Sequence, residues 1–168
     1  KRLEAKNITA IIPWLGYSKQ DREFRKGEAV SIELVAKLLE TAGFEKIIAV
    51  ELHSQTVKEY FKIPIIELSA KDLIKRIILQ KKENNFIVIS PDLGGKGRSS
   101  EFARIMDWPI AYLDKKRDYN DGKVVIERID KDIKDRQVII YDDIINTGAT
   151  AAETANFLHK KGAKKIIF

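Results

Sequence analysis

The sequence predicts an α/β protein with mainly parallel sheets flanked by helices, and two observations support this class. Short, almost continuously apolar segments alternate along the chain with longer segments in which apolar residues recur at helical spacing. Strands buried on both faces of a parallel sheet show such continuous apolar runs, because helices cover both faces. Glycine and proline separate many of these segments, as expected where helices and strands end.

The first part of the chain contains two strand signals with a helix between them. Residues 8–16, ITAIIPWLG, predict a buried strand that runs into a Pro/Gly turn. Residues 29–43 carry apolar side chains at helical spacing and end at Gly43, which is typical of a helix and its stop. Residues 46–53, KIIAVELH, predict the next strand.

The alternation continues to the last residue. Residues 69–83 predict an amphipathic helix whose N-terminus Ser69 can cap. The turn RDYNDGK, with its Asn-Asp-Gly, makes the segment after it a hairpin arm. The further segments are strands at 86–90, 109–114, 124–129, 136–143 and 164–168, and helices at 97–106 and 149–162.

Length and composition limit the classes of protein. A chain of 168 residues with 44% hydrophobic content can form one ordinary domain or two small ones. It starts with Lys rather than Met and ends on a strand only just begun, so we expect a fragment. The absence of cysteine excludes disulfides, a thiolate nucleophile and a Cys-based zinc site. Without an apolar run of about 18 residues or a signal peptide, we expect a cytoplasmic protein.

The net charge indicates a class of partner without choosing its member. Lys and Arg number 31 against 25 Asp and Glu, which gives a formal charge of +6. Such a balance suits nucleic acid, a nucleotide or a sugar phosphate. A solvated, lysine-rich surface explains it equally well.

Polar side chains follow each of the apolar strands that the sequence predicts. Because open α/β sheets bind ligands at the carboxyl ends of their strands, we expect these segments to form a ligand site. The segments, in chain order, are GYSKQDRE, ELHSQ, PDLGGKGR, DKKRD and DDIINTGAT.

The segment DDIINTGAT has the composition of a sugar-phosphate site. Gly148 and neighbouring backbone N–H groups can bind an anion at the N-terminus of the next helix, with Thr147 and Thr150 as hydroxyl donors. Asp142 and Asp143 can accept hydrogen bonds from sugar hydroxyls or hold a divalent cation. An Asx turn followed by a helix cap is the alternative, and it leaves the second Asp unexplained.

Two other segments could also contact a phosphate group, but their sequence patterns are less specific. Asp92 in PDLGGKGRSS can meet a cation, and its glycines let backbone approach a phosphate, although a plain glycine-rich turn fits as well. The spacing differs from that of the P-loop, which argues against a P-loop kinase. In DKKRD, Lys115, Lys116 and Arg117 can stabilise charge on a transferring phosphoryl group, or they form a solvated charge run.

Histidine and aromatic residues add further candidates. His53 follows a strand and can ligate a metal through its neutral imidazole, whereas His159 lies beside lysines and is expected on the surface. Trp14 and Tyr17 follow the first strand, where a ring can stack on a base, and Lys19 can meet a phosphate. Trp14 can equally belong to the core.

Taken together, these motifs resemble those of the ribose-phosphate pyrophosphokinases, also called phosphoribosyl pyrophosphate synthetases. GYSKQDR, ELHSQ, SPDLGGKGR, LDKKRD and YDDIINTGAT occur in that order and cover nearly the whole chain, from Ile8 to Phe168. DDIINTGAT alone is shared with the wider type I phosphoribosyltransferases. The resemblance implies transfer of the diphosphoryl group of ATP to the 1-hydroxyl of ribose 5-phosphate, with Mg2+, giving phosphoribosyl diphosphate (PRPP) and AMP.

The resemblance also implies roles for individual residues. Lys19, Gln20 and His53 would contact ATP, and His53 and Asp92 would serve magnesium and its shell. Lys115 and Arg117 match a catalytic basic pair on a mobile loop. The ribose 5-phosphate site would consist of Asp142, Asp143, Asn146, Thr147, Gly148, Ala149 and Thr150.

Two residues depart from the family pattern. Lys19 stands where the family usually has Arg, so the charge is kept but the bidentate fork is lost. Asn146 stands where many members have Asp, which removes a negative charge beside the ribose. Both departures keep open a non-catalytic regulatory homologue, and a phosphoribosyltransferase that consumes PRPP is the other alternative.

By the same resemblance, the chain would contain parts of two type I phosphoribosyltransferase-like domains, both incomplete. Residues 1–68 would be the later part of the N-terminal domain and residues 69–168 most of the C-terminal one. The expected partners are ATP, ribose 5-phosphate and further copies of the chain in a homo-oligomer. Neither a membrane nor nucleic acid is expected as a partner, since no aromatic and basic platform favours the latter.

Overall fold

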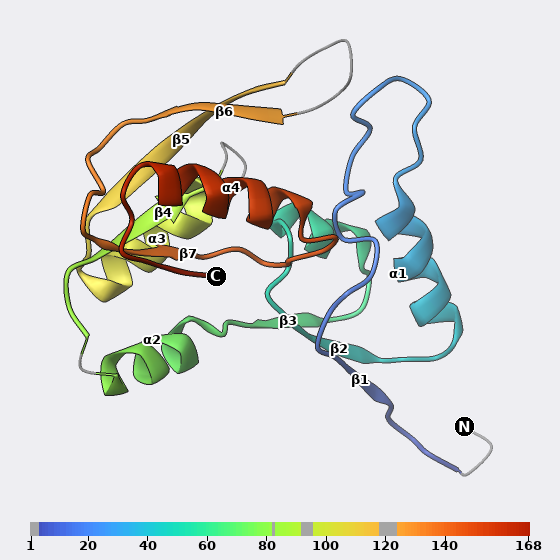
Figure 1. Ribbon diagram of the computed structural model, residues 1–168. Coiled ribbons are helices and arrows are strands. Elements are labelled where there is room, and N and C mark those ends of the chain that lie inside the picture. Colours follow the sequence, from blue (N-terminus) through green and yellow to red (C-terminus); the bar gives the residue numbers. More distant parts are fainter. Residues whose placement is uncertain (1–3, 82, 92–95, 118–123) are drawn as a thin grey trace. The chain divides into compact units, whose positions relative to one another are not determined.

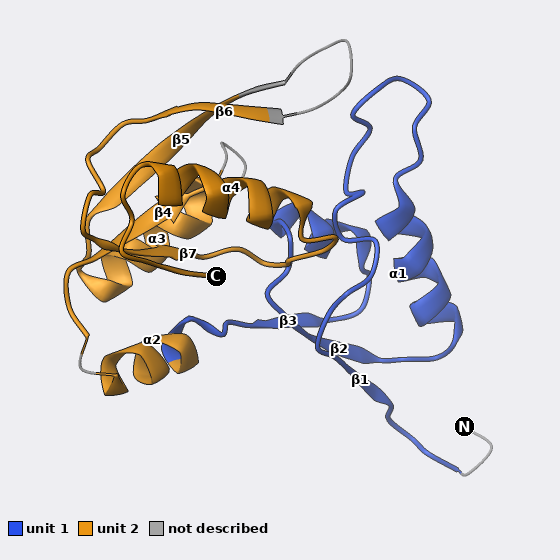
Figure 2. Ribbon diagram, in the orientation of Figure 1, with its two compact units in different colours: residues 1–72 blue, residues 73–168 orange. Residues whose placement is uncertain are grey.

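The computed structural model describes residues 4–81, 83–91, 96–117 and 124–168 (Figure 1). The chain divides into two compact units, residues 1–72 and 73–168 (Figure 2). Each unit contains its own sheet, and neighbouring strands within the sheets are parallel except for one hairpin. The α/β class with mainly parallel sheets is therefore confirmed.

Unit 1 is built on three parallel strands in the order β1-β2-β3. These are β1 (Thr9–Ile12), β2 (Lys46–Val50) and β3 (Ile65–Leu68), with helix α1 (Ser31–Thr41) after β1 and the 3-10 helix η1 (Gln55–Tyr60) after β2. The strand and helix predicted at the start of the chain are confirmed, but the prediction that this strand is buried was wrong, because the residues of β1 alternate between exposed and half-buried. Strand β3 was not predicted.

One face of this sheet forms the core of unit 1. Ile47 and Ala49 of β2 are fully buried in a cluster with Ile32 of α1 and Val57 of η1. The opposite face carries Ile11, Ile66 and Leu68, which are exposed. The alternation of side chains along a strand places these two sets on opposite faces. Parallel sheets ordinarily have both faces covered.

Unit 2 is built on five strands in the order β6-β5-β4-β7-β8, of which β6 alone runs antiparallel to its neighbour. The strands are β4 (Phe86–Ser90), β5 (Ile110–Arg117), β6 (Val124–Ile129), β7 (Gln137–Ile140) and β8 (Lys165–Ile167). The helices are α2 (Lys71–Gln80), α3 (Lys96–Met106) and α4 (Ala149–Lys160). Every residue of β4 is buried, as expected of a central strand.

Helices cover both faces of the unit 2 sheet. Ile87 and Ile89 belong to a buried cluster with Leu158 of α4. Phe86 and Val88, which point to the other face, belong to a cluster that contains side chains of α2 and α3. Because β4 and β7 are parallel neighbours in this sheet, the loops that follow them leave the same edge.

The structure corrects several predicted boundaries: the strands expected at 46–53 and 136–143 end at Val50 and Ile140. The strand expected at 109–114 continues to Arg117 as part of β5 and pairs with β6, with a register irregularity between Asp114 and Lys115. The hairpin arm predicted at 124–129 is confirmed as β6. None of the helices in the described ranges has the length and apolar character needed to cross a membrane.

Candidate substrate-binding sites

The loops after β1 and β2 leave the same edge of the unit 1 sheet. The two strands are parallel neighbours, with Thr9 paired with Lys46 and Ile12 paired with Ala49. Lys19 and Gln20 lie in the loop after β1 and are exposed. His53 lies in the loop after β2 and is half-buried. The predicted ATP contacts in this unit thus lie on adjacent loops.

A buried aspartate joins these two loops. The Asp21 side chain is 7% exposed, and its carboxylate accepts a hydrogen bond from the Ser54 hydroxyl. The hydroxyl of Tyr60 donates to the backbone carbonyl of Asp21 at 2.8 Å. Asp21 directly follows Gln20, and Ser54 directly follows His53. This contact brings the Lys19–Gln20 stretch close to His53.

Glu67 supports the loop after β2 from the end of β3. Its carboxylate accepts hydrogen bonds from the Leu52 amide at 3.1 Å and the Gln55 side chain at 3.0 Å, and forms an ion pair with Lys58 at 2.8 Å. Burial opposes ionisation of Glu67, but the hydrogen bonds from Lys58 and Gln55 outweigh it and lower its pKa below the ordinary value. The ionised Glu67 carboxylate therefore fixes the position of the segment that contains His53.

In unit 2, the paired acids follow β7. Strands β4 and β7 are parallel neighbours, so Asp142 and Asp143 lie at the carboxyl edge of the sheet. The Asp143 side chain is 7% exposed and that of Asp142 is 34% exposed. The backbone amide of Asp143 donates to Asp142 Oδ1 at 2.9 Å. A guanidinium nitrogen, Arg98 Nη1, lies 2.8 Å from Asp143 Oδ1 and 3.3 Å from Asp142 Oδ1.

This environment changes the acidity of Asp142. Burial, followed by a hydrogen bond with the Asp143 side chain, raises its pKa from 3.8 to about 6. The Arg98 guanidinium acts in the opposite direction, because it favours the charged carboxylate. A carboxyl group that titrates close to physiological pH is typical of a functional site.

The residues from Asn146 to Thr150 lead into the N-terminus of α4. Gly148 adopts a left-handed conformation with φ of 80°, and no side chain caps the helix. The Ala149 amide reaches Thr147 Oγ1 only at 3.4 Å, while Asn146, Thr147 and Thr150 are exposed. Amide groups at the start of a helix bind anions well, because the helix dipole favours negative charge there. This segment can hold a phosphate group.

Gly148 is expected to be required for the loop conformation. Alanine at this position should lower the free energy of unfolding by about 1 to 2 kcal/mol, because a Cβ disfavours positive φ. An added Cβ would meet no atom within 4 Å, so the cost would come from the backbone alone. Denaturant unfolding measures the change.

Gly97→Ala provides the matched control. Gly97 lies in α3, where an added Cβ also meets nothing within 4 Å. Alanine there should raise the free energy of unfolding by about 0.5 to 1 kcal/mol, because glycine disfavours helices. Equal effects of the two substitutions would contradict a special requirement at Gly148.

The predicted catalytic cations do not lie in a loop directly after a strand. Lys115 and Arg117 belong to β5, where they pair with Ile126 and Val124 of β6. The expectation of a loop at DKKRD was wrong, because the hairpin extends the strand through these charged residues. Asp92, the predicted magnesium residue, lies outside the described residues.

Other predicted residues can be placed individually. Trp14 is 60% exposed, so the alternative that it belongs to the core is excluded, and Tyr17 is 63% exposed. His159 is exposed, as predicted. Within the described part of the chain, no group of three or more His, Cys, Asp or Glu residues could hold a metal ion.

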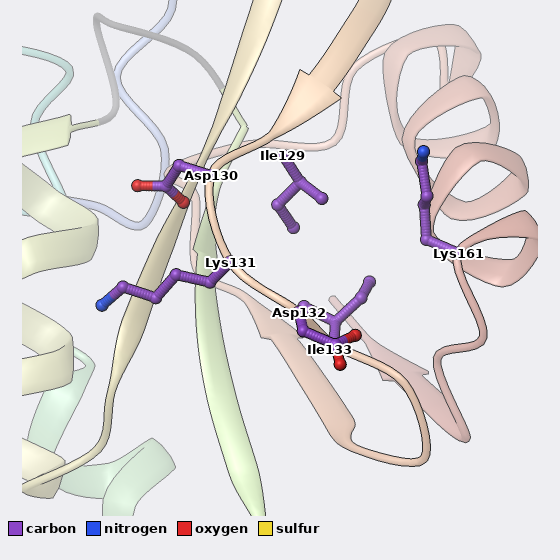
Figure 3. A pocket seen from close by; sticks show the side chains of 6 residues that line it. All are labelled: Ile129, Asp130, Lys131, Asp132, Ile133 and Lys161. Atoms are coloured by element: carbon purple, nitrogen blue, oxygen red, sulfur yellow. The ribbon is translucent and has the colours of Figure 1, made fainter.

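A hollow of about 310 Å3 in unit 2 has none of the predicted site residues in its lining (Figure 3). Its acids already accept hydrogen bonds: Asp130 from the Tyr112 amide at 2.7 Å and Asp132 from the Lys134 amide at 2.9 Å. It therefore offers no clear ligand chemistry. The hollow is lined by Ile129, Asp130, Lys131, Asp132, Ile133 and Lys161.

Sequence reasoning missed two residues that the structure places in these sites, Asp21 and Arg98. Both lie within quoted motifs, GYSKQDR and SPDLGGKGR, but no pairing could be inferred from the motifs alone. Asp21 contacts Ser54, which lies 33 positions later in the chain, and Arg98 contacts Asp142, which lies 44 positions later. The signal in the sequence was limited to the position of each charged residue within a motif that already contained a candidate site residue.

Comparison with known proteins identifies the class. The family described as "Phosphoribosyl transferase domain" matches residues 56–168, and the family described as "N-terminal domain of ribose phosphate pyrophosphokinase" matches residues 1–43. The chain therefore belongs to the phosphoribosyltransferase-domain family. Within that family, the resemblance to the ribose-phosphate pyrophosphokinases is confirmed by the relatives below.

Relatives named ribose-phosphate pyrophosphokinase match almost the whole chain. The relative from Prochlorococcus marinus is 36% identical, and the match covers 99% of this chain and 50% of the relative's length. The relative from Methanothermobacter thermautotrophicus is 39% identical, and the match covers 99% of this chain and 57% of the relative's length. The crystal structure of phosphoribosylpyrophosphate synthetase from Mycobacterium smegmatis has a TM-score of 0.88 at 34% identity, covering 99% of this chain and 54% of that one. The chain spans about half the length of these relatives. The predicted phosphoribosyltransferase-like fold is confirmed, whereas the domain division at residue 68 stays a prediction.

Proposed function

We propose that the full-length protein transfers the diphosphoryl group of ATP to the 1-hydroxyl of ribose 5-phosphate, producing PRPP and AMP. The observation that carries the ribose 5-phosphate part of this proposal is the Asp142–Asp143 pair, which lies a few residues before an uncapped helix N-terminus. Acids and helix amides in this order suit a sugar with a terminal phosphate. The names of the relatives at 34–39% identity support the same activity.

The ribose 5-phosphate would bind to unit 2. Its phosphate would accept hydrogen bonds from amides and hydroxyls between Asn146 and Thr150, with Gly148 and Ala149 in the turn. Asp142 and Asp143 would accept hydrogen bonds from the ribose hydroxyls. Asn146 can still donate through its amide, so its replacement of an acid leaves phosphate binding intact.

ATP would contact Lys19, Gln20 and His53, which unit 1 brings together through the bond between Ser54 and Asp21. In the reaction, the 1-hydroxyl oxygen attacks the β-phosphorus of ATP. The bond from that phosphorus to the oxygen shared with the α-phosphate breaks, AMP leaves, and the hydroxyl proton passes to solvent. Lys115 and Arg117 would stabilise the negative charge that moves in this step.

Magnesium would assist by neutralising charge on the ATP phosphates. The carboxylate donors at the site suit Mg2+, which binds through one or two carboxylates and substrate phosphates while it keeps several waters. His53 and Asp92 would hold the ion and its shell, as the family resemblance implies. We also expect a homo-oligomer, as the family resemblance implies.

The decisive test is AMP release by the full-length protein from ATP and magnesium, measured with and without ribose 5-phosphate. AMP that forms only with the sugar phosphate, together with an equal amount of PRPP, is the expected result. If ribose 5-phosphate binds without AMP release, a phosphoribosyltransferase or a non-catalytic homologue replaces this proposal. PRPP-dependent coupling to a nucleobase would identify the former.

A further inference from the structure

Arg98 lies against both acids of the Asp142–Asp143 pair. Its Nη1 atom is 2.8 Å from Asp143 Oδ1 and 3.3 Å from Asp142 Oδ1. The Arg98 side chain is 15% exposed, and of its two partners Asp143 is better shielded from water than Asp142. Ion pairs with arginine are strongest in such partly buried sites, where solvent screening is weaker.

The stability of α3 does not account for a cation at this position. Arg98 lies in the first turn of the helix, which begins at Lys96 and has no acidic residue there. The positive end of the helix dipole disfavours cations at an N-terminus. The side chain therefore gains its favourable interaction from the acids after β7 rather than from its own helix.

The surrounding contacts hold the guanidinium and the acids in one frame. Tyr141, which directly precedes Asp142, stacks on Phe102 of α3 with ring centroids 4.4 Å apart and planes 8° apart. The Ser99 hydroxyl, next to Arg98, lies 3.4 Å from the Tyr141 carbonyl. Phe102 is fully buried and Tyr141 is 6% exposed. Helix α3 is thus packed against Tyr141, the residue between β7 and the acids, next to the ion pair.

Adjacent, partly buried carboxylates repel each other when both are charged. Among the described residues, the charged groups that act on Asp142 are Asp143, which disfavours its ionisation, and Arg98, which favours it. A cation between them compensates the repulsion and fixes the directions of their lone pairs. Hydroxyl groups of a ribose need acceptors with such fixed directions.

We propose that Arg98 is a positioning residue that holds the Asp142 and Asp143 carboxylates ready to accept hydrogen bonds from ribose hydroxyls. This inference rests on the proposed function, because it assigns Arg98 to the sugar site of that reaction. The planar guanidinium can bridge two carboxylates, whereas the ammonium of lysine is a point charge. Lysine at this position would therefore restore the charge but only part of the geometry.

The test measures the dissociation constant of ribose 5-phosphate by calorimetry, without ATP, from pH 5.5 to 8 in the full-length protein. Arg98→Met should weaken binding about 10- to 100-fold, as expected for lost hydrogen bonds between charged groups. It should also raise the pH below which binding weakens, and Arg98→Lys should fall between wild type and Arg98→Met. Arg104→Met, an exposed arginine of the same helix, should bind as wild type does.

Each result decides the inference. If folded Arg98→Met binds with wild-type affinity and pH dependence, Arg98 does not position the acids. If circular dichroism shows that Arg98→Met does not fold, Arg98→Lys decides: weaker binding supports the role, and wild-type binding overturns it. Failure of the wild type to bind ribose 5-phosphate overturns the proposed function together with this inference. Wild-type binding without AMP release overturns the proposed reaction alone.

Discussion

Replacing both Lys115 and Arg117 by alanine is expected to lower kcat for AMP release about 1,000-fold in the full-length protein. Phosphoryl-type transfer depends on cations that stabilise charge in the transition state, and single arginines contribute factors of this size. The dissociation constant of ribose 5-phosphate should change by less than about threefold, because Asp142 and the α4 N-terminus would bind it. Steady-state kinetics and calorimetry measure the two effects separately.

The hairpin itself provides the control for this double substitution. Arg128 of β6 is 78% exposed and forms an ion pair with Asp114 at 2.9 Å. Arg128→Ala removes a cation from the same two strands but from an exposed pair, which contributes at most about 1 kcal/mol. It should leave kcat unchanged. A comparable loss of kcat in both variants would mean that hairpin stability, rather than charge at Lys115 and Arg117, controls the rate.

Ribose 5-phosphate binding is expected to weaken as the pH falls through 6. The pKa of Asp142 is raised to about 6, so the carboxylate that would accept hydrogen bonds becomes protonated below that pH. Each further pH unit should reduce its charged fraction about tenfold. The second ionisation of a phosphate monoester also lies at about 6, so the ligand contributes to the same trend.

Asp142→Asn separates the two contributions. The pH dependence that remains in this variant belongs to the ligand, and the difference from wild type belongs to Asp142. Identical pH profiles would exclude a role for the Asp142 charge in binding. The free energy of unfolding should change in the opposite direction and rise as the pH falls. The folded-state pKa of Asp142 exceeds the unfolded value of 3.8, so ionisation of Asp142 destabilises the folded state. This penalty is present above pH 6 and declines as the pH falls from 6 toward 4.

Most of the fold could be predicted from apolar periodicity, because buried strands and helices have distinct patterns. The segment FIVIS at 86–90 is entirely buried as β4, and the helix expected at 149–162 is α4. Strand β3 was missed because its short apolar run follows Pro64 and includes Glu67. The extension of β5 was missed because charged residues are rare in central strands but acceptable in a two-stranded arm beside a sheet edge.

The site was predictable in its parts but not in its connections. Strand ends identified the acids after β7 and the loops with Lys19 and His53, since parallel strands direct their carboxyl ends to one edge. The contacts of Asp21 with Ser54 and of Arg98 with Asp143 depend on packing between segments far apart in sequence. Local patterns do not encode such contacts, so only the structure reveals them.

The pairing of β4 with β7 links substrate binding to the order of folding. Phe86 pairs with Gln137 and Ile89 with Ile140, so two segments about 50 residues apart must meet before Arg98 and the acids can face each other. Contacts of that sequence separation form slowly, because closing the loop between them costs entropy. A nascent chain would therefore acquire the sugar-phosphate site in the same cooperative step that completes its central strands. Occupancy of the site would draw the folding equilibrium toward that completed sheet.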